Sequence, residues 1–151
     1  YRTLPDREHT SVGGSSLGGL ISLHILRRHN DTFSQAAIIS PSLWWDDSAE
    51  LKAIASADAW IQQSRLWIDL GDAESDDAGN VRNLSAVKLL HAILMQAKRE
   101  EGKDYVVKIV PDGRHNEAAW AARFEDVLRF LFPPEPQPAA EPGGPPRRNR
   151  R

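Results

Sequence analysis

Two kinds of hydrophobic pattern alternate along this chain. Short strand-like runs, of which residues 36–40 are apolar on both faces as in a buried parallel strand, alternate with longer segments that carry apolar residues at helical spacing. The strand-like runs lie at residues 10–13, 36–40, 65–70 and 105–110. The helix-like segments lie at residues 17–29, 48–57, 81–101 and 116–132. A strand followed by a helix, four times over, predicts an α/β fold, a parallel sheet with helices on both faces.

Local signals place the ends of these helices. Ser48 and Asn116 are residue types that cap helix N-termini, and Gly102 is expected to stop the longest helical segment. Trp120, one turn into the last helix, is expected to pack against the sheet.

The glycine-rich turn after the first strand carries the strongest chemical signal. Gly14, Ser16 and Gly18 form the pattern G-x-S-x-G between a strand and a helix, which indicates a nucleophile elbow. On such a turn the serine hydroxyl projects at the carboxyl end of the sheet, and the first N–H groups of the helix face an anion that forms there. The competing interpretation is a glycine-rich turn with ordinary capping serines.

A serine nucleophile needs a base and an acid, and both follow later strands in the order that this architecture requires. His115 follows the fourth strand after a short turn, so it can reach Ser16, and we predict it as the general base. The other histidines lie within helices, at the end of one or before the first strand: His9, His24, His29 and His91.

The acid comes from the loop after the third strand, where five acidic residues crowd together: Asp69, Asp72, Glu74, Asp76 and Asp77. Glu74 lies three residues past Gly71, at which the strand ends, and it is the predicted acid, with Asp72 as the alternative. Asp69 lies within the strand itself. The last two carboxylates are expected to face solvent.

Composition narrows the possible functions. The length of 151 residues, with 40% hydrophobic and 26% charged, suits one globular domain. No apolar run is long enough to span a membrane. The net charge of −2 gives no general attraction for nucleic acid, and the absence of cysteine excludes thiolate catalysis and cysteine-ligated metals. We predict no metal site, no cofactor and a cytoplasmic location.

The end of the chain differs from the rest. Residues 133–151 hold seven of the ten prolines and four arginines, with no large apolar residue. Such a composition predicts a disordered tail. The folded domain is therefore expected to comprise residues 1–132.

Three segments resemble one known group of enzymes, the Putative esterase family of α/β-hydrolases, which includes esterase D-type and siderophore esterases. Residues 13–45 resemble its nucleophile-elbow region, residues 71–74 its acid loop and residues 115–120 its histidine segment. The resemblance implies Ser16 as the nucleophile, Glu74 as the acid and His115 as the base. It also implies the N–H of Leu17 as one oxyanion donor.

The resemblance covers residues 9–132 and corresponds to the C-terminal half of an α/β-hydrolase fold. It implies an N-terminal half upstream, with further strands and the second oxyanion N–H. Without that half, the strand at residues 10–13 has an open edge, which invites association. An upstream segment or a homo-oligomer is expected to cover this edge.

Together these features predict a serine carboxylesterase that hydrolyses a small-molecule ester through an acyl-enzyme. Trp44 and Trp45 follow the second strand and are expected to line the acyl or alcohol pocket, with packing over the missing half as the alternative. Two other functions stay open. One is an acyltransferase with the same triad, and the other is a non-catalytic fragment or assembly module with a vestigial triad.

Overall fold

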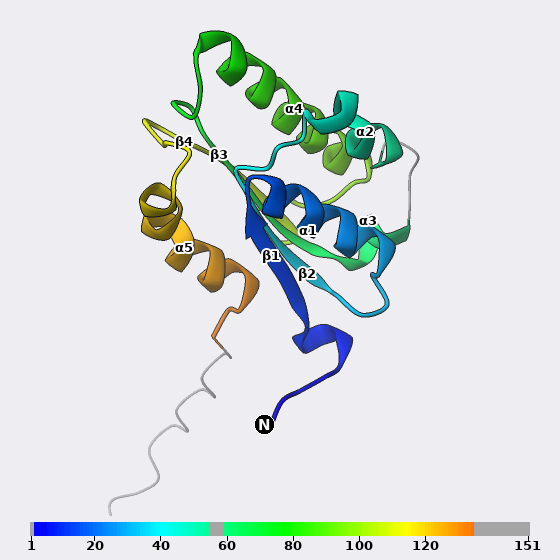
Figure 1. The fold of residues 1–151 in the computed structure, drawn as a ribbon. Helices are drawn as coiled ribbons and strands as arrows, with labels where there is room; N and C mark the ends of the chain where they lie inside the picture. Colours follow the sequence, from blue (N-terminus) through cyan, green and yellow to red (C-terminus); the bar gives the residue numbers. More distant parts are fainter. Residues whose placement is uncertain (1, 55–58, 135–151) are drawn as a thin grey trace, which may run out of the picture.

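The computed structural model describes residues 2–54 and 59–134, and within them four strands form one parallel sheet. The strands follow the order β1-β2-β3-β4, which is also their order along the chain (Figure 1). They are β1 (Ser11–Ser15), β2 (Gln35–Ile39), β3 (Arg65–Gly71) and β4 (Tyr105–Val110). The predicted α/β fold with a parallel sheet is therefore confirmed.

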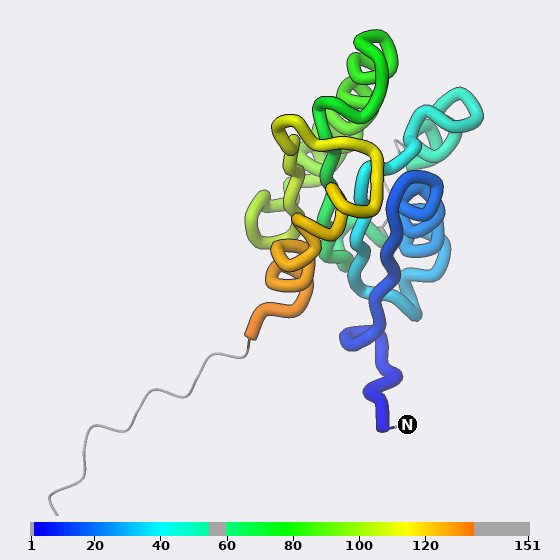
Figure 2. The backbone as a smooth tube through the Cα atoms, turned by 60° about the vertical axis from the view of Figure 1, so that its left-hand side comes forward, coloured from blue at the N-terminus to red at the C-terminus, as the bar shows by residue number. Residues whose placement is uncertain are grey.

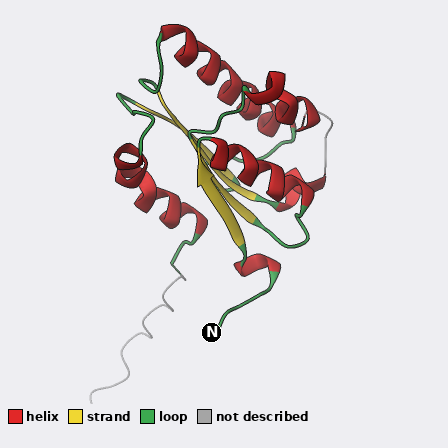
Figure 3. Cartoon of the chain, viewed as in Figure 1, coloured by secondary structure: helices red, strands yellow, loops and turns green. Residues whose placement is uncertain are grey.

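Helices cover the two faces of the sheet unequally (Figures 1 and 3). After the short 3-10 helix η1 (Arg7–His9), one face is covered by α1 (Leu17–Arg28), α2 (Trp45–Ile54), α3 (Ala59–Gln63) and α4 (Asp77–Gln96). Helix α5 (Glu117–Leu131) packs on β2 and β3 from the opposite face. The carboxyl ends of the four parallel strands lie on the side of the sheet away from the N-terminal segment, and the loops that follow the strands gather there (Figure 2).

Alternating side chains along the central strands build two separate cores, because successive residues of a strand point to opposite faces. Ile38 and Ile68 are fully buried in the larger core beneath α1–α4. Ala37, Ile39 and Trp67 point the other way, into a smaller core with Val127 and Leu131 of α5. The central strands are thus apolar on both faces, as the sequence pattern indicates.

The helix predicted over residues 81–101 has both ends wrong. It begins at Asp77, because the side chain of Asp76 caps it by accepting a hydrogen bond from the N–H of Gly79 at 2.8 Å. It ends at Gln96, well before Gly102, because the chain turns at Lys98 with φ of 58°. The side chain of Arg99 then donates to the backbone carbonyls of Gln62, in α3, and Ser64, between α3 and β3.

The remaining expectations about helix ends and the tail have different outcomes. The predicted cap Asn116 is confirmed, since its side chain accepts from the N–H of Ala119 at 2.9 Å. The helix predicted from Ser48 instead begins at Trp45 and is described to Ile54, with left-handed backbone at residues 46–48. Its expected continuation to residue 57 and most of the predicted tail, residues 135–151, lie outside the described residues.

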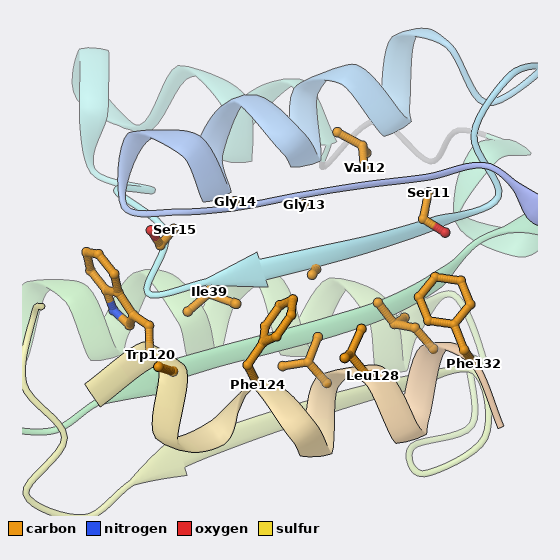
Figure 4. A pocket seen from close by; sticks show the side chains of 14 residues that line it. Ser11, Val12, Gly13, Gly14, Ser15, Ile39, Trp120, Phe124, Leu128 and Phe132 are labelled. Carbon is orange, nitrogen blue, oxygen red and sulfur yellow. The ribbon is translucent and has the colours of Figure 1, made fainter. Parts of the chain in front are cut away.

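The strand β1 stands at one end of the sheet and pairs with β2 alone among the described strands. An apolar groove of about 620 Å³ runs between β1 and α5. Figure 4 shows Phe124 and Leu128 of α5, and Phe132 directly after it, along one wall of this groove and the glycines of β1 along the other. The open edge expected for the first strand is therefore present in this structure.

Candidate active site

The turn between β1 and α1 holds Ser16 in an uncommon backbone conformation. Its φ of 59° and ψ of −123° are rarely adopted by residues other than glycine and cost of the order of 1–3 kcal/mol. Backbone hydrogen bonds hold the turn in place: the N–H of Ser16 donates to the carbonyl of Ile39 at 3.0 Å, and its carbonyl accepts from Ser42 and Leu20 at 3.1 Å. The hydroxyl consequently stands at the carboxyl end of the sheet.

The glycine at position 14 is required by a close approach of strand and helix. A Cβ atom on Gly14 would lie 2.7 Å from the carbonyl carbon and oxygen of Gly18, a contact that real side chains do not make. The first glycine of the G-x-S-x-G pattern thus has a steric cause in this fold, because β1 and the first turn of α1 pass close to each other at this point.

His115 brings the three predicted residues together. Its Nε2 lies 2.8 Å from Oγ of Ser16, and its Nδ1 lies 2.9 Å from Oε2 of Glu74. Ser16 follows β1, Glu74 follows β3 and His115 follows β4, so the three side chains meet at the carboxyl ends of separate strands. This geometry fits a hydroxyl, a base within hydrogen-bond reach and a carboxylate that orients the base.

Two glycines let the acid loop and the histidine loop touch. A Cβ on Gly71 would lie 2.2 Å from the carbonyl oxygen of Gly113, and the N–H of Ala73 donates to that same oxygen at 3.1 Å. In Asp72, the alternative acid, Oδ1 accepts a hydrogen bond from the N–H of Asp112 at 2.7 Å. The Asp72 carboxylate therefore braces the two loops, and Glu74 is the carboxylate that reaches the histidine.

The acid candidate Glu74 is buried, whereas the base candidate His115 is partly exposed. The side chain of Glu74 is 1% exposed, whereas that of His115 is 36% exposed. Trp120 stands edge-on to the imidazole, with ring centroids 5.0 Å apart and an interplanar angle of 84°. Trp120 also packs on the smaller core, as expected, so it links the histidine to the sheet.

Three buried polar residues behind Glu74 escaped the sequence analysis as parts of the site: Ser40, Asp69 and Arg123. The guanidinium of Arg123 donates from Nε to Asp69 at 3.0 Å and from Nη2 to the hydroxyl of Ser40 at 2.7 Å. That hydroxyl in turn is hydrogen-bonded to Oε1 of Glu74. A continuous buried polar network therefore supports the carboxylate on the side away from His115.

Sequence signals for these residues do exist. Arg123 lies on the apolar stripe of α5 with Trp120, Val127 and Leu131, so its spacing places a cation where the helix faces the sheet. Ser40 directly follows β2 and therefore obeys the same strand-end rule that identifies the catalytic candidates. Polarity on a buried helix face therefore indicates Arg123, and position at a strand end indicates Ser40.

The remaining predicted site residues lie close to the turn of Ser16. Leu17 is the first residue of α1, so its N–H has no acceptor within the helix. Trp45 and Leu17 both line a groove of about 580 Å³ between α1 and α2. Trp44 lies against Trp45, with ring centroids 6.0 Å apart, and its ring lies under the guanidinium of Arg82.

The described residues hold no metal cluster and no membrane-spanning helix. No group of three or more histidine, aspartate or glutamate side chains in residues 2–54 and 59–134 is arranged to hold a metal ion. No helix in the same ranges is long and apolar enough to cross a membrane.

Comparison with known proteins gives a family match over most of the chain. The model of the family described as Putative esterase matches residues 1–131. Among curated proteins, the uncharacterized protein YbbA of Bacillus subtilis is 27% identical over 133 residues, which are 83% of this chain and 51% of that protein. This chain therefore spans about half the length of the curated relative.

Solved structures show the same fold in longer chains. A ferulic acid esterase is similar with a TM-score of 0.70 and 20% identity, over 87% of this chain and 53% of its own. The enterochelin esterase of Shigella flexneri is similar with a TM-score of 0.72 and 21% identity, over 86% of this chain and 32% of its own. Identities this low establish the shared α/β-hydrolase-type fold alone.

Proposed function

The chain belongs to the Putative esterase family, and we propose that it hydrolyses carboxylic esters with Ser16 as the nucleophile. The observation that carries the proposal is the hydrogen bond of 2.8 Å between His115 Nε2 and the hydroxyl of Ser16, on a strained strand-to-helix turn. A bare serine hydroxyl is a weak nucleophile at neutral pH, and a base at this distance is what activates it.

The proposed reaction runs through an acyl-enzyme. His115 takes the hydroxyl proton as Ser16 Oγ attacks the ester carbonyl carbon, and the same proton then goes to the departing alcohol. A water molecule later gives its proton to His115 and attacks the acyl-serine, which releases the acid and restores the serine. Glu74 holds Nδ1 of His115 at 2.9 Å, which fixes the ring orientation and stabilises the imidazolium.

The tetrahedral intermediate needs hydrogen-bond donors for its oxyanion. We assign one of them to the N–H of Leu17, at the positive end of the α1 dipole. The second donor is proposed to come with the protein that covers the open edge of β1, either an upstream segment or a second copy of the chain. Loss of one such donor costs about 10²–10³ in rate.

For the ester itself, the groove that begins at Leu17 supports an apolar group next to the nucleophile. Trp45 and Ile21, both about half exposed, stand along this groove. We propose that it holds the acyl or alcohol part of a small-molecule ester.

The test of the function is hydrolysis of p-nitrophenyl acetate and p-nitrophenyl butyrate by the full chain. We expect turnover by the wild type and none above background for Ser16→Ala or His115→Ala. Ser85→Ala is the matched control, because Ser85 lies on the exposed side of α4 and donates only to the carbonyl of Val81. Turnover that survives Ser16→Ala would contradict the proposal.

The two alternatives give different results in the same assay. An acyltransferase would deliver the acyl group to an added alcohol in preference to water, so the products identify it. A chain that folds but shows no turnover, alone or as an oligomer, would be the non-catalytic assembly module.

A further inference from the structure

The buried network behind Glu74 contains the guanidinium of Arg123, which has no role in the proposed mechanism. The side chain of Arg123 is 4% exposed, and those of Asp69 and Glu74 are 0% and 1% exposed. Its Nη2 lies 3.0 Å from Oδ1 of Asp69 and 3.6 Å from Oε1 of Glu74. One guanidinium therefore stands between two buried carboxylates, only one of which contacts the histidine.

Ser40 passes the orientation of Arg123 on to Glu74. A serine hydroxyl has one proton to donate and two lone pairs. Ser40 Oγ accepts from Nη2 of Arg123 at 2.7 Å and from Nε1 of Trp120 at 3.0 Å, so both lone pairs are used. Its proton is left for Oε1 of Glu74.

The two oxygens of Glu74 are thereby given separate partners. Oε1 accepts from the hydroxyl of Ser40 and from the N–H of Gly71, the latter at 2.7 Å. Oε2 accepts from Nδ1 of His115. Because Oε1 is held from two sides, Oε2 can point only toward the imidazole.

The charges of the network give Arg123 a second effect. With a neutral imidazole, the groups facing Glu74 (Asp69 from β3, Arg123 from α5 and His115 from the loop between β4 and α5) leave a net charge of −1 with Glu74 itself. A proton on His115 brings that sum to zero. Without Arg123 the sum is −2, and the added negative charge favours the imidazolium of His115 over the neutral imidazole. The imidazolium cannot act as the base.

We propose that Arg123 is a positioning residue for the esterase site, which aims Glu74 at His115 through Ser40 and sets the lower pH limit of activity. The inference rests on the proposed function. Arg123 acts through Glu74, and its counterpart Asp69 acts in the opposite sense, because Asp69 adds a negative charge where Arg123 adds a positive one.

The test measures kcat/KM for p-nitrophenyl acetate as a function of pH. Arg123→Met is expected to move the acid limb of the profile up by about one pH unit, and Asp69→Asn, which keeps the shape, to move it down. Arg123→Lys keeps the charge and is expected to restore the position of the limb, though not the full kcat. Arg129→Met is the matched control, since Arg129 lies on the same helix and pairs with exposed Glu125.

A second readout does not depend on turnover. The Nδ1–H proton of His115, hydrogen-bonded to Glu74, is expected as a low-field resonance in the proton NMR spectrum of the wild type. It should be absent in Glu74→Gln, lost or shifted in Arg123→Met and unchanged in Arg129→Met. Circular dichroism checks the fold of each variant, and if Arg123→Met does not fold, Asp69→Asn and Arg123→Lys carry the test.

Opposite shifts of the acid limb for Arg123→Met and Asp69→Asn would support the inference. Lower activity in both variants with an unmoved limb and a retained low-field resonance would overturn it and leave Arg123 with a structural role. If the wild type hydrolyses no ester, the proposed function fails by itself. The resonance then decides the inference about Arg123: its loss in Arg123→Met supports the inference, and its retention overturns it.

Discussion

The same three residue types, a glutamate, a histidine and an arginine, meet at two places in this molecule. At the end of the sheet, Glu74 contacts His115 at 2.9 Å and Arg123 at 3.6 Å. Between α1 and α2, Glu50 contacts His24 at 2.8 Å and Arg27 at 2.6 Å. The histidine contacts are alike, so a histidine beside a glutamate does not by itself identify a catalytic site. The arginine contacts differ, because Arg27 hydrogen-bonds Glu50 directly and Arg123 is linked to Glu74 through Ser40.

What differs is the place of each group in the fold. His115 stands in a loop beyond a strand end, and its second nitrogen faces the hydroxyl of Ser16 on a strained turn. His24 lies within α1, and its described hydrogen bond joins it to Glu50 of the neighbouring helix. The first group has the geometry that the proposed proton transfer needs, and the second joins two helices. We therefore propose that position at the strand ends distinguishes the catalytic group from the packing group.

Replacing each of the two histidines with alanine should give the largest difference in activity between the two groups. His115→Ala removes the proposed base, and we expect kcat/KM for p-nitrophenyl acetate to fall by about 10⁴-fold or more. His24→Ala should leave kcat within about threefold of the wild type, because His24 contacts Glu50 and reaches no reacting atom. Any effect is expected on KM, since His24 also lines the groove proposed for the substrate. Comparable losses in the two variants would erase the distinction between the groups.

The two glutamates test the same contrast with a smaller expected effect. Glu74→Gln keeps the shape but replaces the carboxylate that stabilises the imidazolium, and we expect kcat/KM to fall by about 10³-fold. Glu50→Gln should leave kcat within about threefold of the wild type, with any effect on KM, because Glu50 lines the groove proposed for the substrate but contacts no reacting atom. Steady-state kinetics on both variants checks this, and an active Glu74→Gln would return Asp72 to consideration as the acid.

Glu50 is expected to matter for stability and for its dependence on pH. Burial raises the pKa of Glu50, but hydrogen bonds from Arg27 and His24 outweigh burial and hold that pKa below its ordinary value. The stabilisation is therefore complete above the unfolded-state pKa of about 4.5 and is lost as the pH falls toward the lower folded value.

Urea unfolding of the wild type and Glu50→Gln at a series of pH values measures this contribution. We expect Glu50→Gln to lower the free energy of unfolding by about 1–3 kcal/mol at pH 7 and the two curves to converge below pH of about 4. A constant difference across that range would show that ionisation of Glu50 contributes nothing.

The smallest expected effect concerns the groove beside the nucleophile. Trp45→Ala should raise KM for p-nitrophenyl butyrate by about fivefold, equivalent to about 1 kcal/mol, with kcat little changed. Trp44→Ala is the comparison, because Trp44 packs under Arg82 and does not line that groove. Equal effects of the two variants would argue against a binding role specific to Trp45.

Much of the site was accessible from the sequence because local rules determine it. Ser16 was predicted from a turn in which Gly14 is sterically required, and Glu74 and His115 from their distance from strand ends. The parallel sheet was predicted from the alternation of strands and helices. Each of these features depends on a few neighbouring residues, so a single sequence suffices to predict them.

What sequence reasoning missed depends on contacts between distant segments. Just beyond the end of α4, Arg99 donates hydrogen bonds to the carbonyls of Gln62 and Ser64, and no pattern near residue 99 indicates them. Ser40 and Arg123 join the site across 83 positions of sequence. The contact between Ser40 and Arg123 exists only in the folded sheet, so the sequence does not show it. Their positions at a strand end and on a buried helix face do mark them as candidates for the site.

The central claim is that Ser16 is the activated nucleophile of this chain. Labelling of the full chain with a fluorophosphonate, followed by peptide mass mapping, tests it most directly because the reagent reports the reactive hydroxyl itself. The account predicts one phosphonyl group on Ser16, absent in Ser16→Ala and in His115→Ala and retained in His24→Ala. A folded wild type that takes up no label, or takes it on another residue, would contradict the account.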